Sequence, residues 1–379
     1  MNFTSSPIYV LMMLCLMVIL SETVAKTKYG KQFGTALIVI IFTAILANLN
    51  LIPSASDSID LYSGIFKFIA PISIFYLLLN VNLTSIKQAG LPMVGLFLLG
   101  SLATTLGVLI SWWLLSPENT LGENGSIIAG MLTGTYTGGS VNFNAVALEY
   151  DFQEKGILYA GTIAVDNVVT TIWIIATLAF PVLLKRLWKE KLSTPDAVSK
   201  ATTHPVVESM DAKSLMWLAF LGIAAYYISD LIAAYVPQVP SILILTTIGI
   251  LLAQTKFVAN LKGSQSLGLY LVYIFLAVIG AYCELSAVAE LKDVGITLLL
   301  FTSVAVLIHG ILIILIGGLL YRDWDMIAIV SQANIGGGTT AIALAETFDR
   351  KELILPAILV GSLGNALGTY LGFMVIYLL

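Results

Sequence analysis

Charged side chains are scarce in this chain of 379 residues. Lys, Arg, Asp and Glu make up 11% of it, whereas a typical soluble domain carries about 25%. The formal net charge is −4 and diffuse, and no basic cluster indicates a nucleic-acid partner. The two cysteines, Cys15 and Cys283, both fall in apolar segments, where we expect them to pack. No C-x-x-C pair or His/Cys spacing typical of a metal site is present.

Sequence motifs of catalysis are also absent. The chain has no G-x-S-x-G and no paired aspartates of the kind that an intramembrane protease needs, although Ser140 and His309 are present. It has no G-x-x-x-x-G-K-[ST] phosphate-binding loop either. We therefore expect neither an enzyme nor a bound cofactor, and no direct use of ATP to drive transport.

Apolar residues are abundant instead, at 58% of the chain with a mean hydropathy of +0.96. Apolar runs recur along the whole length, and each has roughly the 17 to 25 residues that a helix needs to cross a bilayer. The first run lacks a basic n-region, so we interpret it as a membrane helix rather than a signal peptide. The sequence predicts an all-α polytopic membrane protein. Ten plain runs are expected to cross the membrane: 7–25, 33–51, 60–83, 91–115, 157–184, 215–235, 239–255, 266–288, 295–320 and 353–378.

Two further runs, 126–149 and 327–347, have the length of one crossing but are interrupted in the middle. The first contains the stretch MLTGTYTGGSVNFNA and the second contains SQANIGGGTTAIALA. A shift of 198 residues places Gly138-Gly139 on Gly336-Gly337 and Asn167 on Asn365 without a gap. Internal symmetry of this kind is typical of secondary transporters built from two repeats.

The repeat divides the chain into three parts. Residues 1–184 form a first membrane repeat half, and residues 215–379 form a second, inverted half. Residues 185–214 form a long polar link that carries several lysines. We expect this link to be an ordinary solvated connector on the cytoplasmic side.

The distribution of Lys and Arg tests two ways of threading the interrupted runs. If each run crosses the membrane once, eight of the 18 basic residues lie inside and ten lie outside, which is no bias. If each run dips in and returns, fifteen lie inside and only Lys67, Lys155 and Lys292 lie outside, in agreement with the positive-inside rule. The re-entrant threading also places an odd number of crossings between equivalent helices, so the two halves have opposite orientations in the membrane. We favour two re-entrant hairpins, one from each side; crossing helices that are unwound at their centres are the alternative.

Each interruption combines glycines with hydroxyl and amide side chains. Unpaired backbone groups in hydrocarbon cost roughly several kcal/mol each, so a helix breaks at membrane depth only where protein or a water-filled cavity covers it. Free helix C-terminal ends offer carbonyls to a cation, and N-terminal ends offer N–H groups to an anion. The competing interpretation is close packing of small residues. We predict that a solute contacts Thr137, Gly138, Gly139, Ser140, Asn142, Asn334, Gly336, Gly337, Thr339, Thr340 and Asn365, and that an ion contacts Thr135, Asn144, Asp166, Asn167 and Gln332.

Asp166 lies in the apolar context AVDNVV. A charged group near the bilayer centre is costly and is a functional candidate by default. Its possible roles are to bind Na⁺, to carry a proton, or to pair with a hydroxyl for structural reasons. His309 is a candidate proton relay, although a lone histidine at such a position more often packs. Asp230 is expected at the interface, and Asn80 and Asn82 are candidates to line the cavity. No Arg lies at mid-membrane, so an anionic solute would depend on helix N-termini, amides and a co-bound cation.

The stretches GTYTGGSVNFNAVA and ANIGGGTTAIALAETF, with the Asp-Asn helix that follows the first, resemble the YjcL-like family. This bacterial and plastid membrane family is classed as domain of unknown function 819, and the resemblance covers nearly the whole chain. The family brings no established substrate. More distantly, the layout is similar to sodium–glutamate symporters, bile-acid symporters and cation/proton antiporters.

The distant resemblance implies an architecture. It has inverted repeats, two broken or re-entrant elements that cross near the midplane, and a moving core domain against a static panel. Residues 126–175 and 327–378 would belong to the core, and helices 33–51 and 239–255 to the panel and a dimer interface. Antiporters of that group often carry Asn-Asp or Asp-Asp after the broken helix, and this chain departs from that pattern with Asp166-Asn167.

These observations predict a secondary active transporter coupled to Na⁺ or H⁺. It would move a small polar solute, such as an organic anion or an amino acid, by an elevator-type alternating-access mechanism. A Na⁺/H⁺ antiporter with Asp166 as its exchange site is the alternative, and a non-transporting sensor or scaffold is a further one. We expect a multi-pass protein of the cell inner (plasma) membrane that forms a homodimer. Its partners would be the solute, the coupling ion and the bilayer, and not nucleic acid.

Overall fold

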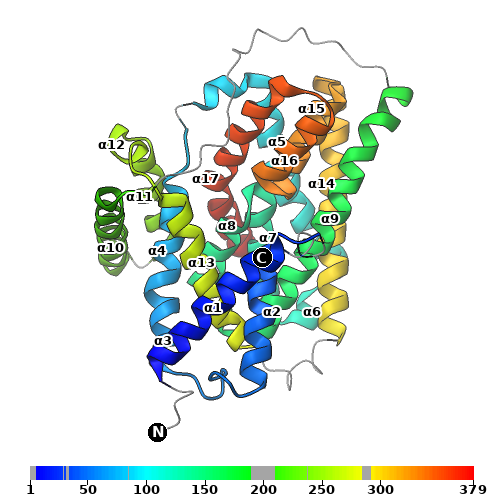
Figure 1. Ribbon diagram of the computed structural model, residues 1–379. Helices are drawn as coiled ribbons and strands as arrows, with labels where there is room; N and C mark the ends of the chain where they lie inside the picture. Colours follow the sequence, from blue (N-terminus) through cyan, green and yellow to red (C-terminus); the bar gives the residue numbers. More distant parts are fainter. Residues whose placement is uncertain are drawn as a thin grey trace.

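The computed structural model describes residues 6–28, 30, 34–83, 85–188, 210–236, 238–283 and 292–379. Within these ranges the chain is helical and contains no strand (Figure 1). Most of the predicted connector, residues 189–209, lies outside the described residues.

All ten plain apolar runs form helices close to the predicted bounds. Pro residues at the first turn start several of them, such as α1 and α5, because the missing proline N–H has no partner there in any case. Eight helical segments are long and apolar enough to cross a membrane, whereas α2 and α11 have 15 and 13 residues. The helices are α1 (Pro7–Ala25), α2 (Gly34–Asn48), α3 (Asp60–Gly64) continuing through η3 (Ile65–Ile69) into α4 (Ala70–Leu78), α5 (Leu91–Leu115), α9 (Gly156–Leu187), α10 (Ala212–Tyr235), α11 (Ser241–Ala253), α13 (Ser264–Ala281), α14 (Lys292–Leu320) and α17 (Ile354–Leu378). Short helical turns join some of them: η4 (Ile86–Ala89), α6 (Glu118–Leu121), η5 (Phe152–Glu154), α12 (Lys256–Ala259) and η7 (Lys351–Leu353).

The two interrupted runs are helical hairpins. Hairpin 1 consists of α7 (Asn124–Gly138) and α8 (Ser140–Glu149), and hairpin 2 of α15 (Trp324–Ile335) and α16 (Gly337–Thr347). Residues eight apart are about 12 Å apart along a continuous helix. Here Gln332 Nε2 donates to Thr340 Oγ1 at 3.0 Å, and a Cβ on Gly134 would lie 3.2 Å from Asn142 Cβ. The two arms of each hairpin therefore lie side by side, and the alternative of crossing, centrally unwound helices is wrong.

The hairpins approach each other from opposite ends of the molecule. Hairpin 1 begins beside α6 and hairpin 2 begins beside the end of α9, where Trp324 Nε1 donates to the Trp188 carbonyl at 2.9 Å (Figure 1). Their tips meet: a Cβ on Gly337 would lie 3.9 Å from the Gly138 carbonyl oxygen. The polar stretches of the sequence thus come together inside the helix bundle.

The backbone repeats itself at the 198-residue shift. Gly139 and Gly337 lie at the breaks between the two arms, with φ of 125° and 79°. Asp151 and Asp349, which also match under the shift, both have left-handed backbones with φ of 48° and 53°. A short 3-10 turn follows each, and then α9 or α17. The repeat read from the sequence therefore recurs in local conformation.

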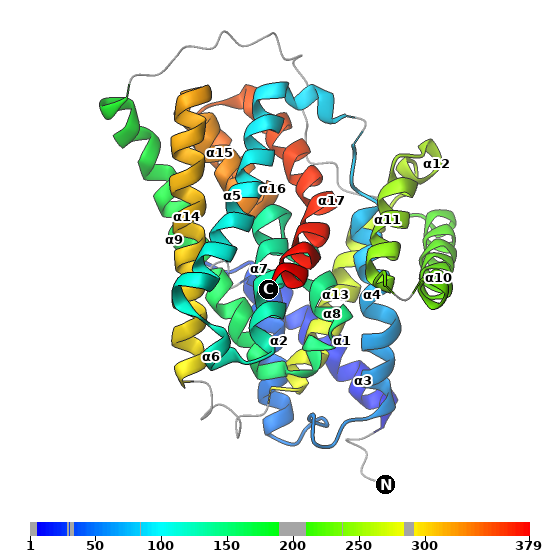
Figure 2. The same cartoon turned by 180° about the vertical axis from the view of Figure 1, so that it is seen from behind.

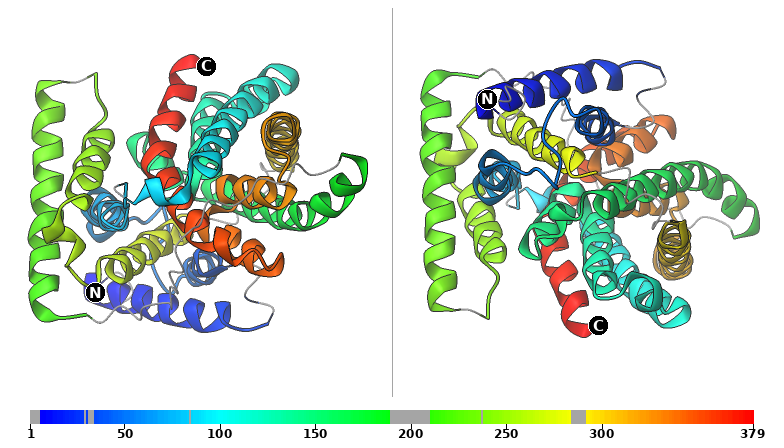
Figure 3. Two further views of the ribbon diagram at one scale, coloured as in Figure 1. Left: turned by 90° about the horizontal axis from the view of Figure 1, so that it is seen from above. Right: turned by 90° about the horizontal axis from the view of Figure 1, so that it is seen from below.

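The helices form two groups (Figure 3). In the first, here called the panel group, α13 packs on α2 and α4, and α1, α10 and α11 pack around them. In the second, the hairpin group, α14 packs on α5, α15 on α9, and α17 on both hairpins. Each half of the chain contributes to both groups. Seen from above, α1 and α10 extend across the view whereas α14 is seen end-on, so these two apolar helices are steeply inclined to α14.

Helix α17 occupies the middle of the hairpin group, beside α5 and α7 (Figure 2). Glycines allow this close approach, as is common between membrane helices. A Cβ on Gly364 would lie 2.4 Å from the Thr137 carbonyl oxygen and 2.6 Å from Gly138 Cα. On the other side of α17, Gly361 meets Gly338 of hairpin 2 in the same way.

We expect Gly364→Ala to destabilise the protein by about 1–3 kcal/mol, the usual cost of overpacking. The contacted atoms belong to the backbone of hairpin 1, so they cannot move aside as a side chain would. Thermal unfolding in one detergent measures the effect. Gly161→Ala is the matched control because a Cβ there meets nothing within 4 Å. Equal melting temperatures for the two variants would contradict this account of α17.

Candidate functional site

A cavity of about 610 Å³ lies between the two helix groups at the hairpin tips. The hairpin group supplies both tips, the middle of α9 and the first half of α17. The panel group supplies the start of α2, the end of α4 and the first part of α13. Eleven of the sixteen predicted site residues line it: Thr135, Gly138, Gly139, Ser140, Asn144, Asp166, Asn167, Gly336, Gly337, Thr339 and Asn365.

Two buried polar side chains in the lining have unused hydrogen-bonding groups. Thr135 and Asn144 are each only 4% exposed. Asn144 Oδ1 accepts from the Tyr159 hydroxyl, while Asn144 Nδ2 and Thr135 Oγ1 have no partner among the described residues. Neither atom is among the fully buried unpaired atoms of the described residues, so both open onto the cavity, where water, an ion or a solute can pair with them.

Among the described residues that line the cavity, Asp166 is the one carboxylate, and they include no Lys, Arg or His. Thr170 Oγ1, one turn further along α9, donates to Asp166 Oδ1 at 3.3 Å. The buried Tyr136 hydroxyl lies close enough to interact with this carboxylate electrostatically. A half-buried carboxylate without a cationic side chain beside it favours a bound cation or a proton. No group of three or more His, Cys, Asp or Glu capable of holding a metal occurs in the described part of the chain.

Helix ends also face the cavity. Hairpin 1 breaks at Gly139, whose φ of 125° and ψ of 176° suit glycine almost alone. No side chain caps the start of α8, and Ser140 and Val141 of its first turn line the cavity. The first N–H groups of a helix have no intrahelical partner and attract anions. The end of α7 offers carbonyls beside them.

Five predicted site residues lie outside the cavity lining. Their side chains hold the hairpins instead, because these faces of the two hairpins pack against neighbouring helices. Asn142 Oδ1 accepts from Thr369 N and Oγ1, at 3.1 and 2.8 Å, and so joins α8 to α17. Asn334 Nδ2 donates to Ser101 Oγ on α5 at 3.1 Å. The remaining three are Thr137, Gln332 and Thr340. Thr137 donates to the Thr133 carbonyl within α7, and Gln332 donates to Thr340 within hairpin 2. Gln332 also accepts from Thr177 on the neighbouring α9.

The panel side of the cavity was mostly missed by sequence reasoning. Asn80 lines it, as suggested, while the Asn82 backbone N–H donates to Ser362 Oγ on α17 at 3.1 Å. Gln265 and Tyr273 on α13 are further polar lining residues. Their sequence context is an ordinary apolar run, and no repeat or break singles them out.

His309 lies in a closed network behind hairpin 2 rather than in the cavity. It is fully buried. Its Nδ1 lies 3.1 Å from the Gly100 carbonyl oxygen, which can only accept, so Nδ1 carries the proton. Its Nε2 then accepts from Ser331 Oγ at 3.0 Å, and Trp173 Nε1 donates to the same hydroxyl at 3.1 Å. This arrangement fixes a neutral imidazole that joins α14, α5, α15 and α9.

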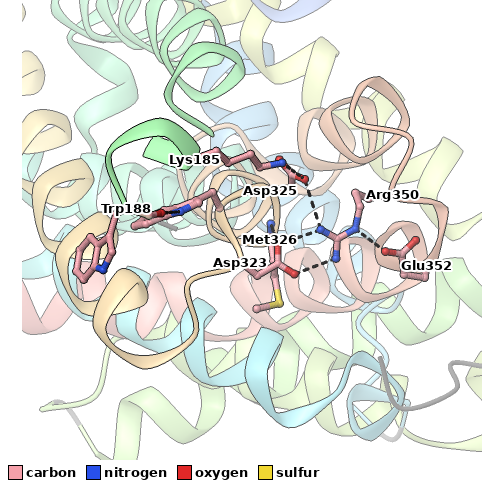
Figure 4. Close-up of polar contacts among 8 residues, drawn as sticks. Lys185, Trp188, Asp323, Asp325, Met326, Arg350 and Glu352 are labelled. Atoms are coloured by element: carbon pink, nitrogen blue, oxygen red, sulfur yellow. Dashed lines mark hydrogen bonds and ion pairs between the residues drawn. The ribbon is translucent and has the colours of Figure 1, made fainter. Parts of the chain in front are cut away.

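An ion-pair cluster closes the far end of hairpin 2 (Figure 4). Arg350, just after α16, donates through both Nη atoms to the two Asp323 oxygens at 2.9 Å. Asp323 also caps α15 by accepting from Met326 N at 3.0 Å. Lys185 at the end of α9 pairs with Asp325 at 2.8 Å. The hydrogen bonds that Arg350 donates to Asp323 and to Glu352 raise the pKa of its guanidinium, so this clamp stays charged.

Similarity to known proteins covers the whole of this arrangement. A family model described as "Protein of unknown function (DUF819)" matches residues 9–379. The "Uncharacterized membrane protein YjcL" of Bacillus subtilis (strain 168) is 26% identical in an alignment 368 residues long that covers 92% of this chain and 90% of the relative. Both hairpins and every wall of the cavity lie within the family match, and the name of the relative describes a membrane protein without stating an activity.

Proposed function

We propose that this multi-pass membrane protein, which belongs to the family described as "Protein of unknown function (DUF819)", is a cation-coupled secondary transporter of a small polar solute. One observation carries the proposal: two glycine-broken hairpins from opposite ends meet at a polar cavity between two helix groups. Secondary transporters bind their substrates and ions at such discontinuous helices near the midplane. The contact of Gly107 with Ala305, which match under the 198-residue shift, supports two halves related by an inverted two-fold axis.

The coupling ion in this proposal is Na⁺. Asp166, Asn167, Thr135 and Asn144 offer oxygen atoms from α7, α8 and α9 within one cavity, and the carbonyls at the end of α7 add more. Hard cations prefer such ligands. Gln332, which the sequence also suggested, is engaged with Thr177 and Thr340 and takes no part. The solute would lie between the two tips, beside Ser140, Thr339 and Asn365.

The cavity position supports an elevator-type cycle in which the hairpin group moves against the panel group. Its lining comes from the end of α4, the start of α13 and the first half of α17, which all lie toward the ion-pair cluster. At the opposite end the groups touch backbone to backbone, since a Cβ on Gly156 would lie 2.5 Å from the Tyr282 carbonyl carbon. We infer a state that faces the side of the polar connector, which the distribution of basic residues puts in the cytoplasm.

The remaining properties belong to the same proposal. We infer a protein of the cell inner (plasma) membrane that works as a homodimer, is not an enzyme and holds no resident cofactor.

The alternative transport function is a Na⁺/H⁺ antiporter in which Asp166 exchanges the two cations. It is favoured by the position of Asp166 as the carboxylate of the cavity, without a cationic partner there.

Reconstitution into proteoliposomes tests the proposal. Uptake of radioactive sodium is measured with and without a mixture of small carboxylates and amino acids on the same side, while a trapped dye reports internal pH. We expect sodium uptake to require the solute mixture. Sodium-driven proton movement without any solute would establish the antiporter instead. If sodium moves under neither condition, both versions of the proposal fail.

A further inference from the structure

The cavity wall is chemically asymmetric. The hairpin group supplies most of the polar side chains, with Thr135, Ser140, Asn144, Asp166 and Asn365 close to the tips. The panel group supplies apolar side chains opposite them on α4 and α13: Leu77, Leu269, Val272 and Leu276. Its polar groups are Thr35 at the start of α2, Asn80 just after α4, and Gln265 and Tyr273 on α13, so apolar side chains cover only part of this wall. A solute that fills this space needs a polar head and an apolar body.

The polar half accommodates one anionic group and no more. With Na⁺ at Asp166 the side-chain charge of the described lining residues is neutralised, because no Lys, Arg or His is among them. One carboxylate can then accept from the free N–H groups of Ser140 and Val141 at the uncapped start of α8 and from Asn144 Nδ2. A second carboxylate placed against Leu269, Val272 and Leu276 would be buried among apolar side chains, which is strongly unfavourable.

A cationic group on the solute is equally disfavoured. An ammonium group would have to share Asp166 with the coupling ion, since Asp166 is the carboxylate of the lining. Thr135 Oγ1 and Asn144 Nδ2, which have no partner among the described residues, can pair with one small ion and one carboxylate head. The volume of about 610 Å³ lies within the roughly 300–1,000 Å³ range of ligand sites, so a compact body also fits.

We propose that the solute is a small monocarboxylate with a compact apolar body, bound together with Na⁺. The carboxylate lies at the start of α8, and the body contacts Leu269, Val272 and Leu276 of the panel group. This inference rests on the proposed transport function and specifies its substrate class. It also assigns separate tasks to the two groups: the hairpin group holds the head and the ion, and the panel group selects the body.

Thermal shift of the purified full-length protein tests the substrate class. Four probes share a branched apolar body and differ in their polar groups. They are isovalerate, its neutral amide isovaleramide, the amino acid leucine and the dicarboxylate methylsuccinate. Acetate serves as a carboxylate that lacks the apolar body. Each is titrated in NaCl and in KCl. We expect isovalerate to raise the melting temperature in NaCl only, at concentrations at least tenfold lower than any other probe.

A variant of the panel group tests the position of the body. Leu276→Asn should weaken isovalerate at least tenfold while it leaves the shift caused by NaCl alone unchanged, which also shows that the variant is folded. A stronger effect of leucine, methylsuccinate or isovaleramide than of isovalerate would overturn the monocarboxylate assignment and leave transport intact. A sodium shift without an effect of any probe would overturn it too. The absence of every shift, together with inactive proteoliposomes, would instead refute the proposed function.

Discussion

Asp166→Asn is expected to remove sodium binding, with a loss of apparent Na⁺ affinity of about 100-fold or more, as for the loss of a charged metal ligand. Asparagine keeps the size of the side chain and can still accept from Thr170 Oγ1, so the fold should persist. What disappears is the negative charge of the lining, which otherwise offsets the cost of desolvating the ion. The measurement is the rise in melting temperature of purified protein as NaCl replaces KCl.

Asp230→Asn provides the matched control. It makes the same chemical change at an exposed carboxylate on α10 that does not line the cavity, and its sodium titration should equal that of the unmodified protein. Solute uptake in proteoliposomes should fall to background only in the Asp166 variant. If the Asp166 variant keeps its sodium response, the ion lies elsewhere. If it loses proton movement that never required a solute, the antiporter is the correct function.

Gly139→Ala is expected to disrupt the tip of hairpin 1 and to reduce solute affinity at least tenfold. The backbone at Gly139 has φ of 125° and ψ of 176°, a region that side-chain-bearing residues avoid at a cost of about 1–3 kcal/mol. Space is not the obstacle, because the nearest atom to an added Cβ is Asn365 Oδ1 at 3.7 Å. The strain must be relieved by moving the start of α8, which holds the proposed carboxylate site.

The control for this prediction is Gly295→Ala on α14. A Cβ there also meets nothing within 4 Å, but the backbone is helical. Both variants are compared by melting temperature and by titration with NaCl and isovalerate. The Gly139 variant should lose most of the isovalerate response while Gly295→Ala keeps it. Identical titrations for the two would show that the geometry of the tip does not govern binding.

Much of the fold follows from the sequence, because crossing a membrane is a local requirement. The runs 7–25 and 91–115 predicted α1 and α5 to the residue, and the others differ from their helices by a few residues. The hairpins followed from glycines in apolar runs combined with the positions of basic residues. The inclination of α1 and α10 did not follow, because hydrophobic length says nothing of tilt, which depends on packing between helices.

The site was predicted in part, and the division has a physical cause. Thr135 and Thr137 lie two residues apart on α7 and therefore point to different faces of one helix. Thr135 lines the cavity, whereas Thr137 bonds to its own helix. Asn144 and Asn142 on α8 separate in the same way, the first into the cavity and the second onto α17. Both members of each pair have the same residue type and a similar sequence context, so the sequence alone could not tell which of them reaches the cavity.

The sequence by itself determined that this is a helical membrane protein, that its two halves repeat at a fixed shift, and where each half breaks. These features depend on hydrophobic length, charge and glycine content, which are properties of short segments. Only the tertiary structure decided which faces of the hairpins reach the cavity, that His309 is enclosed in a network, and that α13 supplies the opposite wall. Those outcomes depend on contacts between helices far apart in the chain, and no single segment encodes such contacts.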